Sequence, residues 1–237
     1  MPFIERFWTV EWSLPAGHVH HQRVVGFPSV ELVLEPGQAR VWGVARRLVC
    51  RRFSGNGSVV GTKFKPGGFA ALFDIDVSTL TDTHVPLATL SEPLDRVLAA
   101  SPDAAGTFPG ARHVPLIEAA LRPLIRGRHE TLAMIGRCFR LARRRHARPS
   151  IAQLATLCGV SSRSLERAFR RYVGVSPKFV LRRLRLIDAL ALIERQVRPD
   201  WRRLALDFGY VDQSHFINDF TSQVGVSPRM YLKGDRS

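Results

Sequence analysis

An internal repeat in the C-terminal part of the chain constrains its fold more than any other feature. Three short motifs occur twice, in the same order. They pair as Ala155-Thr-Leu-Cys-Gly159 with Ala205-Leu-Asp-Phe-Gly209, Leu165-x-x-x-Phe169 with Phe216-x-x-x-Phe220, and Gly174-Val-Ser-Pro177 with Gly225-Val-Ser-Pro228. The offset is 50 residues for the first pair and 51 for the other two. Such self-similarity indicates a duplicated structural unit, with one extra residue in the second copy.

Each copy has the pattern of two helices joined by a tight turn. The first helix ends at a glycine, which adopts the left-handed conformation that stops a helix. The second helix buries apolar residues four positions apart, so that they share one face. We therefore predict two helix-turn-helix units, at about residues 150–172 and 200–223, and such a unit places its second helix in the major groove of DNA.

A long connector helix is predicted between the units, over about residues 177–196. Its segment, PKFVLRRLRLIDALALIERQ, starts with a proline and continues with good helix formers. Such a helix would hold the two recognition helices roughly 34 Å apart, the distance between successive major grooves on one face of DNA.

The positive charge of the chain is concentrated in one segment. Residues 122–203 hold 21 Lys and Arg against five Asp and Glu, whereas residues 1–121 are neutral and residues 204–237 carry −1. A segment with net charge +16 favours a polyanionic partner, and nucleic acid is the usual one. The alternatives are a membrane surface and a solvated, arginine-rich helix surface.

The N-terminal half has a different pattern. Over residues 1–85, short β-branched and aromatic stretches alternate with turn signals such as EPGQ and KPGG, which predicts a small β-barrel or sandwich. Two helices are expected near 92–100 and 115–127, the first capped by Ser91. We therefore predict an α+β fold, with a sensor or dimerisation domain at 1–128 and an all-α domain at 129–237.

The C-terminal motifs closely resemble those of the AraC/XylS family of transcription regulators, over about residues 130–233. Motifs that carry the resemblance are Ile151-Ala-Gln-Leu-Ala155, Leu165-Glu-Arg-Ala-Phe169, Arg183-Leu-Arg185, Phe208-Gly-Tyr210 and Asp212-Gln-Ser-His-Phe216, besides the two GVSP motifs. The resemblance implies sequence-specific binding to double-stranded DNA and control of transcription, often through contact with RNA polymerase. Many members of the family also bind a small-molecule effector and form homodimers through the N-terminal half.

The first recognition helix is expected to expose Ser162, Arg163, Glu166, Arg167 and Arg170. By resemblance, Arg163, Glu166 and Arg167 lie where family members touch base edges. Arginine donates two hydrogen bonds to guanine and glutamate accepts one from cytosine. Other cations, namely Arg170, Arg171 and Lys178, are better placed for phosphates. For each arginine, the alternative is a solvated surface charge.

The second recognition helix is expected to read DNA with Gln213, Ser214, Ile217 and Asn218, again by resemblance. Gln213 and Asn218 suit adenine. A basic residue often stands at position 218 in the family, and here Asp219 follows it. We therefore expect this unit to add less affinity or to read A·T-rich sequence. His215 is expected either to face a phosphate or to cover the core.

The N-terminal half offers only weak site candidates. Trp8, Trp12, Trp42 and Phe64 are the candidates for lining an apolar effector pocket, with core packing as the alternative. His18 and His20 would face the same way on a strand, but no third ligand accompanies them, so no metal site is predicted. The arginines at 46, 47, 51 and 52 fit either an anionic ligand or the protection of an edge strand.

Three readings of the whole chain follow. The first is an effector-responsive regulator, and the second is a regulator whose N-terminal half only dimerises or binds a protein. The third, an enzyme fused to a DNA-binding domain, lacks a complete metal set and an activated cysteine, so no catalytic residue or cofactor is predicted. Short apolar runs and three scattered cysteines, Cys50, Cys138 and Cys158, predict a soluble cytoplasmic protein without membrane contact.

Overall fold

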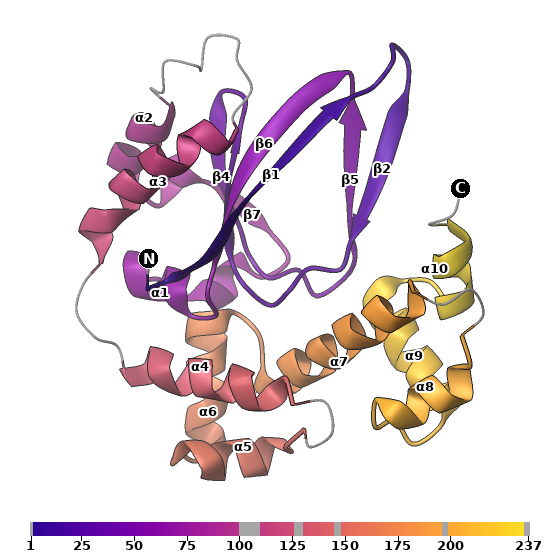
Figure 1. Ribbon diagram of the computed structural model, residues 1–237. Coiled ribbons are helices and arrows are strands. Elements are labelled where there is room, and N and C mark those ends of the chain that lie inside the picture. Colours follow the sequence, from indigo (N-terminus) through magenta and orange to yellow (C-terminus); the bar gives the residue numbers. More distant parts are fainter. Residues whose placement is uncertain (1, 100–109, 126–129, 145–147, 196–198, 235–237) are drawn as a thin grey trace.

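A computed structural model describes residues 2–99, 110–125, 130–144, 148–195 and 199–234. It consists of a β-rich N-terminal half and an all-helical C-terminal half, which lie against each other (Figure 1). The predicted α+β fold class is confirmed. The predicted domain boundary, between residues 128 and 129, falls in the segment 126–129, which is outside the described residues.

Two antiparallel sheets make up the N-terminal half. The larger has the strand order β1-β6-β3-β4-β7, and the smaller pairs β2 with β5. The strands are β1 Ile4–Ser13, β2 Val19–Val24, β3 Glu31–Glu35, β4 Gln38–Trp42, β5 Val49–Ser54, β6 Asn56–Phe64 and β7 His84–Pro86. Every residue of β2 is exposed, so the smaller sheet stands at the edge of the molecule.

The hydrophobic core of this half lies on one face of the larger sheet. Alternate residues such as Leu32, Val41 and Phe64 pack against three helices and are fully buried. These helices are α1 Gly68–Phe73, α2 Glu92–Ala99 and α3 Val114–Leu121, with short 3-10 turns η1 Val77–Leu80, η2 Leu87–Thr89, η4 Ala111–His113 and η5 Arg122–Leu124. Helices α2 and α3 agree with the two predicted near 92–100 and 115–127, although α3 ends at Leu121 and a 3-10 turn follows.

The described strands form two open sheets rather than a closed barrel. Closure would need continuous pairing around the ring, and the two sheets instead meet at one end of β1. There the Trp12 Nε1–H donates to the Ser54 carbonyl oxygen at 3.3 Å, and the Leu14 N–H donates to the Gly55 carbonyl oxygen at 2.9 Å. Of the two predicted architectures, the closed barrel is therefore wrong for the described strands.

The C-terminal half contains the two predicted helix-turn-helix units. Its helices are α4 Glu130–Ala142, α5 Ile151–Cys158, α6 Ser162–Val173, α7 Pro177–Ile193, α8 Trp201–Asp207, α9 Gln213–Val224 and α10 Pro228–Gly234. The first unit comprises α5 and α6, the second comprises α8 and α9, and α7 joins them (Figure 1). The connector ends at Ile193, slightly before the predicted end at 196, a residue outside the described ones.

Candidate nucleic-acid interface

Local sequence explains where each helix of the first unit begins and ends. Ser150 and Gln153 form the predicted capping box, with the Gln153 N–H donating to Ser150 Oγ at 3.2 Å and the Ser150 N–H donating to Gln153 Oε1 at 2.8 Å. Helix α5 stops at Gly159, whose φ is 69°, and α6 stops at Gly174, whose φ is 91°. Gly159 adopts the left-handed conformation that was predicted for it, and Gly174 adopts the same conformation at the end of α6.

A small core holds α6 in place. Leu165 and Phe169 are buried as predicted, together with Leu154 and Ala155 of α5. The Phe169 ring also stacks on Phe139 of α4, with centroids 5.9 Å apart and planes 3° apart. Helix α4 therefore supports the recognition helix from behind, which leaves the opposite face of α6 open.

The exposed face of α6 carries most of the predicted DNA-reading residues. Ser162, Arg163 and Arg167 are exposed, and among the described residues neither arginine has a salt-bridge partner. Glu166 is half-buried and lies 3.6 Å from the Arg170 guanidinium. Two unpaired guanidinium groups, about one helical turn apart, are suited to guanine edges or phosphates.

The remaining cations predicted for phosphates have different surroundings. Lys178 is exposed on the first turn of α7. Arg171 forms a salt bridge with Asp74, which follows α1 in the N-terminal half, at 3.2 Å. Both partners are at least half exposed, so this pair contributes little to stability and its cation is easily released.

The second unit has a less basic recognition helix. Asp212 caps α9 by accepting from the His215 N–H at 2.7 Å, and Gly225, with φ 86°, ends it. Of the predicted reading residues, Ser214 and Asn218 are exposed, whereas Gln213 is half-buried and Ile217 packs partly against the unit's own core. His215 is exposed, and its ring meets Tyr210 edge-on at 5.3 Å.

Asp219 is part of the interior of the second unit. It is 6% exposed and accepts hydrogen bonds from Arg182, from the Tyr210 hydroxyl at 2.8 Å and from the Gln223 amide at 3.3 Å. Burial, together with the neighbouring Asp219 carboxylate, raises the pKa of Tyr210. The negative charge of Asp219 is thus compensated inside the protein.

A fully buried arginine joins the two halves of the chain. Arg183 of α7 donates to the carbonyl oxygens of Arg46 at 2.6 Å and Gly26 at 3.3 Å, and to Gln223 Oε1 at 3.1 Å. Burial lowers the pKa of its guanidinium to about 10, so it remains charged at neutral pH. Sequence reasoning placed Arg183 only within the connector motif, because both carbonyl acceptors are more than 130 residues away.

The N-terminal half contacts both helix-turn-helix units. Thr81 donates from its hydroxyl to the Gly174 carbonyl oxygen at 2.6 Å, at the end of α6. At the second unit, the Leu48 N–H donates to the Gln223 carbonyl oxygen at 3.1 Å, near the end of α9. The N-terminal half therefore holds the C-terminal ends of both recognition helices.

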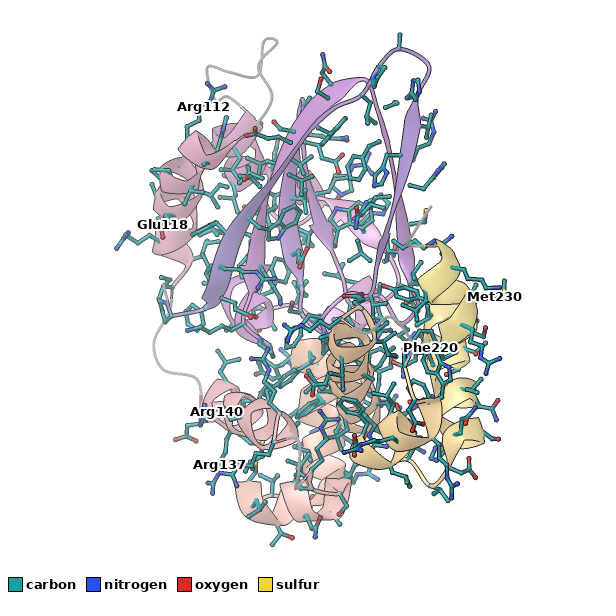
Figure 2. All side chains as sticks on the ribbon, turned by 45° about the vertical axis from the view of Figure 1, so that its right-hand side comes forward. Arg112, Glu118, Arg137, Arg140, Phe220 and Met230 are labelled. Atoms are coloured by element: carbon teal, nitrogen blue, oxygen red, sulfur yellow. The ribbon has the colours of Figure 1, made fainter. Side chains whose placement is uncertain are left out.

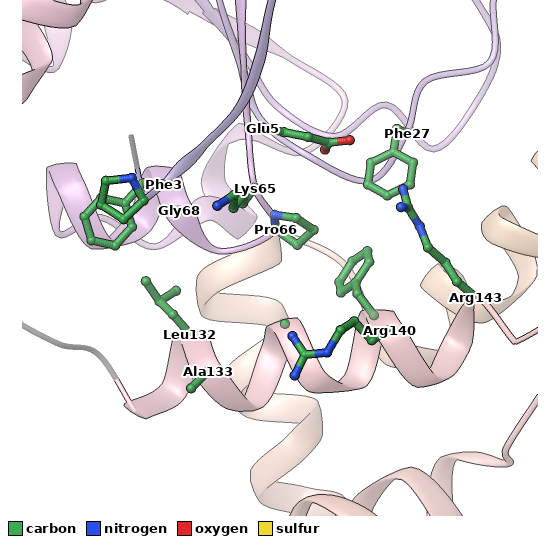
Figure 3. Close-up of a pocket in the computed structure, with 13 residues that line it drawn as sticks. Phe3, Glu5, Phe27, Lys65, Pro66, Gly68, Leu132, Ala133, Arg140 and Arg143 are labelled. Atoms are coloured by element: carbon green, nitrogen blue, oxygen red, sulfur yellow. The ribbon is translucent and has the colours of Figure 1, made fainter.

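A pocket of about 410 Å³ lies between the N-terminal half and α4 (Figure 3). Its apolar wall includes Phe3 and Phe27 from the N-terminal half and Leu132 from α4. Its charged lining residues are three cations, Lys65, Arg140 and Arg143, and one carboxylate, Glu5. Figure 2 shows Arg137 and Arg140 pointing outward from α4. An apolar wall bordered by cations suits a small apolar molecule with an anionic group.

Of the four residues predicted for an effector pocket, the three tryptophans lie on one face of the larger sheet and Phe64 lies on the other. Trp8 and Trp12 lie flat over Gly61 and Gly57 of β6, where any added Cβ would clash with their rings. Trp42 stacks on His84, with centroids 4.1 Å apart, and lies under the Arg51 guanidinium. Phe64 is buried against Phe69 in the core on the other face of the sheet. None of the four lines the pocket beside α4.

The described residues also lack two kinds of feature. They contain no group of three or more His, Cys, Asp or Glu side chains placed to hold a metal ion. None of the described helices has both the length and the apolar character needed to cross a membrane.

Comparison with known proteins finds a family match in each half of the chain. Residues 154–234 match the family model described as a helix-turn-helix domain, and residues 1–86 match a domain of unknown function, DUF6597. An uncharacterized HTH-type transcriptional regulator of Haemophilus influenzae is 34% identical over 83 residues, which are 35% of this chain and 28% of that protein. The transcriptional activator RhaS of Escherichia fergusonii is 32% identical over 81 residues, which are 34% of this chain and 29% of that protein.

A solved structure from Chromobacterium violaceum, a transcriptional regulator with an AraC-type DNA-binding domain, is 26% identical and aligns with a TM-score of 0.39, over 42% of this chain and 89% of that one. The chain spans less than a third of the length of the curated relatives it matches. Residues 154–234 therefore form a helix-turn-helix domain, as the family model describes.

Proposed function

We propose that this chain is a transcription regulator that binds specific DNA sequences with both of its helix-turn-helix units. The observation that carries this proposal is the exposed, unpaired arginine face of α6, in a segment of net charge +16. Residues 129–237 would form the DNA-binding domain, and residues 1–128 would form the sensor or dimerisation domain.

We assign the reading positions as follows. In the first unit, Arg163, Glu166 and Arg167 contact base edges, with Ser162 beside them, while Arg170, Arg171 and Lys178 contact phosphates. In the second unit, Gln213 and Asn218 read bases beside Ser214, and Ile217 provides an apolar contact. Arginine pairs with guanine and amide side chains pair with adenine, so the two half-sites would differ in base composition.

A salt-dependent DNA titration of the full chain tests this proposal. The probe is a duplex selected from random sequence, and a scrambled duplex is its control. We expect tight binding to the selected duplex only, a steep salt dependence and a loss of about 1–3 kcal/mol in Arg167→Ala. Exposed Arg47, outside the helix-turn-helix units, provides a charge-matched control, Arg47→Ala. Equal loss in both variants would contradict base reading by Arg167.

A second candidate function is response to a small-molecule effector. The pocket between the N-terminal half and α4 favours it, because a ligand there would contact both halves and so bind their arrangements unequally. A thermal-shift screen of small aliphatic and aromatic carboxylates tests this: a binder raises the melting temperature of the chain, and less so in Arg140→Glu. If no carboxylate shifts it, the regulator without an effector becomes the better reading.

Partners and location follow from the proposed function. A DNA reader acts where the chromosome is, so we propose a cytoplasmic regulator that contacts RNA polymerase when bound beside a promoter. Homodimerisation through the N-terminal half is a further proposal, tested by light scattering of the full chain. The two relatives are transcriptional regulators, which supports a protein that is not an enzyme.

A further inference from the structure

Two cysteines that are 20 residues apart in sequence lie together beneath the first recognition helix. Cys138 of α4 and Cys158, the last residue of α5, have their Sγ atoms 3.1 Å apart. Both are free thiols within the apolar cluster that also contains Leu165 and Phe169 of α6. The pair therefore sits at the junction of the three helices that form and support the first unit.

The two thiols differ in their access to solvent. Cys138 is 1% exposed. Cys158 is partly exposed and lines a cavity of about 630 Å³, whose other lining residues include Ser164 and Arg167 on α6. Burial, with the hydrogen bond to Cys158, raises the pKa of Cys138 to about 12, so Cys138 remains a thiol. A small oxidant thus reaches Cys158 first.

We propose that Cys138 and Cys158 are an oxidation site, at which hydrogen peroxide converts the two thiols into an intramolecular disulfide. The Cys158 sulfur attacks peroxide, an S–O bond forms, the O–O bond breaks, and one water leaves. The Cys138 thiol then passes its proton to the leaving hydroxyl group as its sulfur attacks the sulfenic acid at Cys158: an S–S bond forms, the S–O bond breaks, and a second water leaves. Both sulfurs are oxidised, one peroxide is reduced, and the two thiol protons end in the two waters.

The disulfide would act on the DNA-reading face of α6 through the short turn that joins α5 to α6. A disulfide bond is about 1 Å shorter than the present contact between the sulfurs, so its formation pulls Cys158, the last residue of α5, toward Cys138 of α4. Only Gly159, Val160 and Ser161 separate Cys158 from α6, and the interior is too closely packed to absorb such a shift locally. We infer that oxidation displaces α6 and weakens DNA binding, and this inference rests on the proposed function.

The chemical part is tested on the full chain carrying Cys50→Ser, which removes the exposed third thiol. After stoichiometric hydrogen peroxide, we expect loss of both remaining thiols, a mass decrease of two hydrogens, a peptide pair joining residues 138 and 158, and complete reversal by dithiothreitol. Two thiols that survive a tenfold peroxide excess would overturn the assignment.

Single variants define the order of events. With Cys138→Ala, Cys158 has no resolving thiol, so a dimedone adduct should form at Cys158. With Cys158→Ser, the buried Cys138 should stay reduced. A dimedone adduct at Cys138 in Cys158→Ser, at the rate seen in the other variant, would overturn the assigned roles. Because serine and alanine are small, circular dichroism of each variant checks that its fold is retained.

The regulatory part is tested by titrating oxidised and reduced Cys50→Ser protein with the same selected duplex. We expect at least tenfold weaker binding after oxidation, restored by dithiothreitol and absent in Cys138→Ala. If the disulfide forms and binding is unchanged, control of DNA binding is overturned and the oxidation site stands. If neither form binds any duplex, the proposed function fails, and the regulatory step with it, while the thiol chemistry is judged separately.

Discussion

The two helix-turn-helix units share a framework and differ in their surfaces. Each has a glycine in the left-handed conformation at the end of its second helix and buried rings or leucines four residues apart. The first unit then presents exposed arginines on α6, whereas the second uses its nearby Arg182 to pair with the buried Asp219. The two copies thus share their helices and the apolar part of their cores, and differ in where their charged residues lie.

The largest expected effect concerns the shared framework. Phe169→Ala and Phe220→Ala should each lower the free energy of unfolding by about 3–5 kcal/mol, because each ring is almost completely buried and leaves a cavity. Urea denaturation followed by far-ultraviolet ellipticity measures both. If the loss in the free energy of unfolding is several-fold smaller in one unit than in the other, the two frameworks are not equivalent.

The second-largest expected effect on stability distinguishes the interior of the second helix-turn-helix unit from that of the first. Asp219→Asn removes the charge that Arg182 and the Tyr210 hydroxyl face, and should cost about 2–3 kcal/mol of stability. Glu166→Gln in the first unit disturbs only a partly exposed pair with Arg170 and should cost less than about 0.5 kcal/mol. Equal costs in the same denaturation assay would show that Asp219 is not structural.

DNA affinity should be divided unequally between the units. Arg167→Ala is expected to weaken specific binding by about 1–3 kcal/mol, and Asn218→Ala by a smaller amount, since Asn218 is a neutral group on the less basic helix. Fluorescence anisotropy with one selected duplex compares them under identical salt conditions. If both variants weaken binding equally, the proposed asymmetry is wrong.

The smallest effect concerns Arg171. Arg171→Ala breaks an exposed salt bridge to Asp74 and should change stability by less than about 0.5 kcal/mol. If Arg171 contacts a phosphate on DNA, the slope of log affinity against log salt should decrease by about one. An unchanged slope would leave Arg171 as a residue of the contact with the N-terminal half only.

Features that depend on local chemistry could be predicted from the sequence. The capping box at Ser150, the terminal glycines and the buried positions of Leu165 and Phe216 follow from rules that act within a few residues. The internal repeat predicted that two helix-turn-helix units follow one another along the chain. The exposure of Arg163 and Arg167 then followed from helical periodicity alone.

Features that depend on packing between distant segments could not be predicted from the sequence. The meeting of Cys138 with Cys158, the burial of Asp219 and the partners of Arg183 are set by how helices approach one another. In the N-terminal half, alternation shows that Phe64 and Lys63 face opposite ways, but only the position of helices α1 to α3 decides which face becomes the core. Whether the strands close into a barrel likewise depends on pairing between strands far apart in sequence.

The acceptors of Arg183 bear on how freely the two halves of this protein could be exchanged with those of other regulators. Two of its three hydrogen bonds go to main-chain carbonyl oxygens, at Gly26 and Arg46, so side-chain replacements in those loops leave them intact. What must be preserved is the path of the loops. A chimaera that joined this C-terminal half to an N-terminal half with different loop paths would leave a buried cation without acceptors, and would be unstable unless position 183 were changed with it.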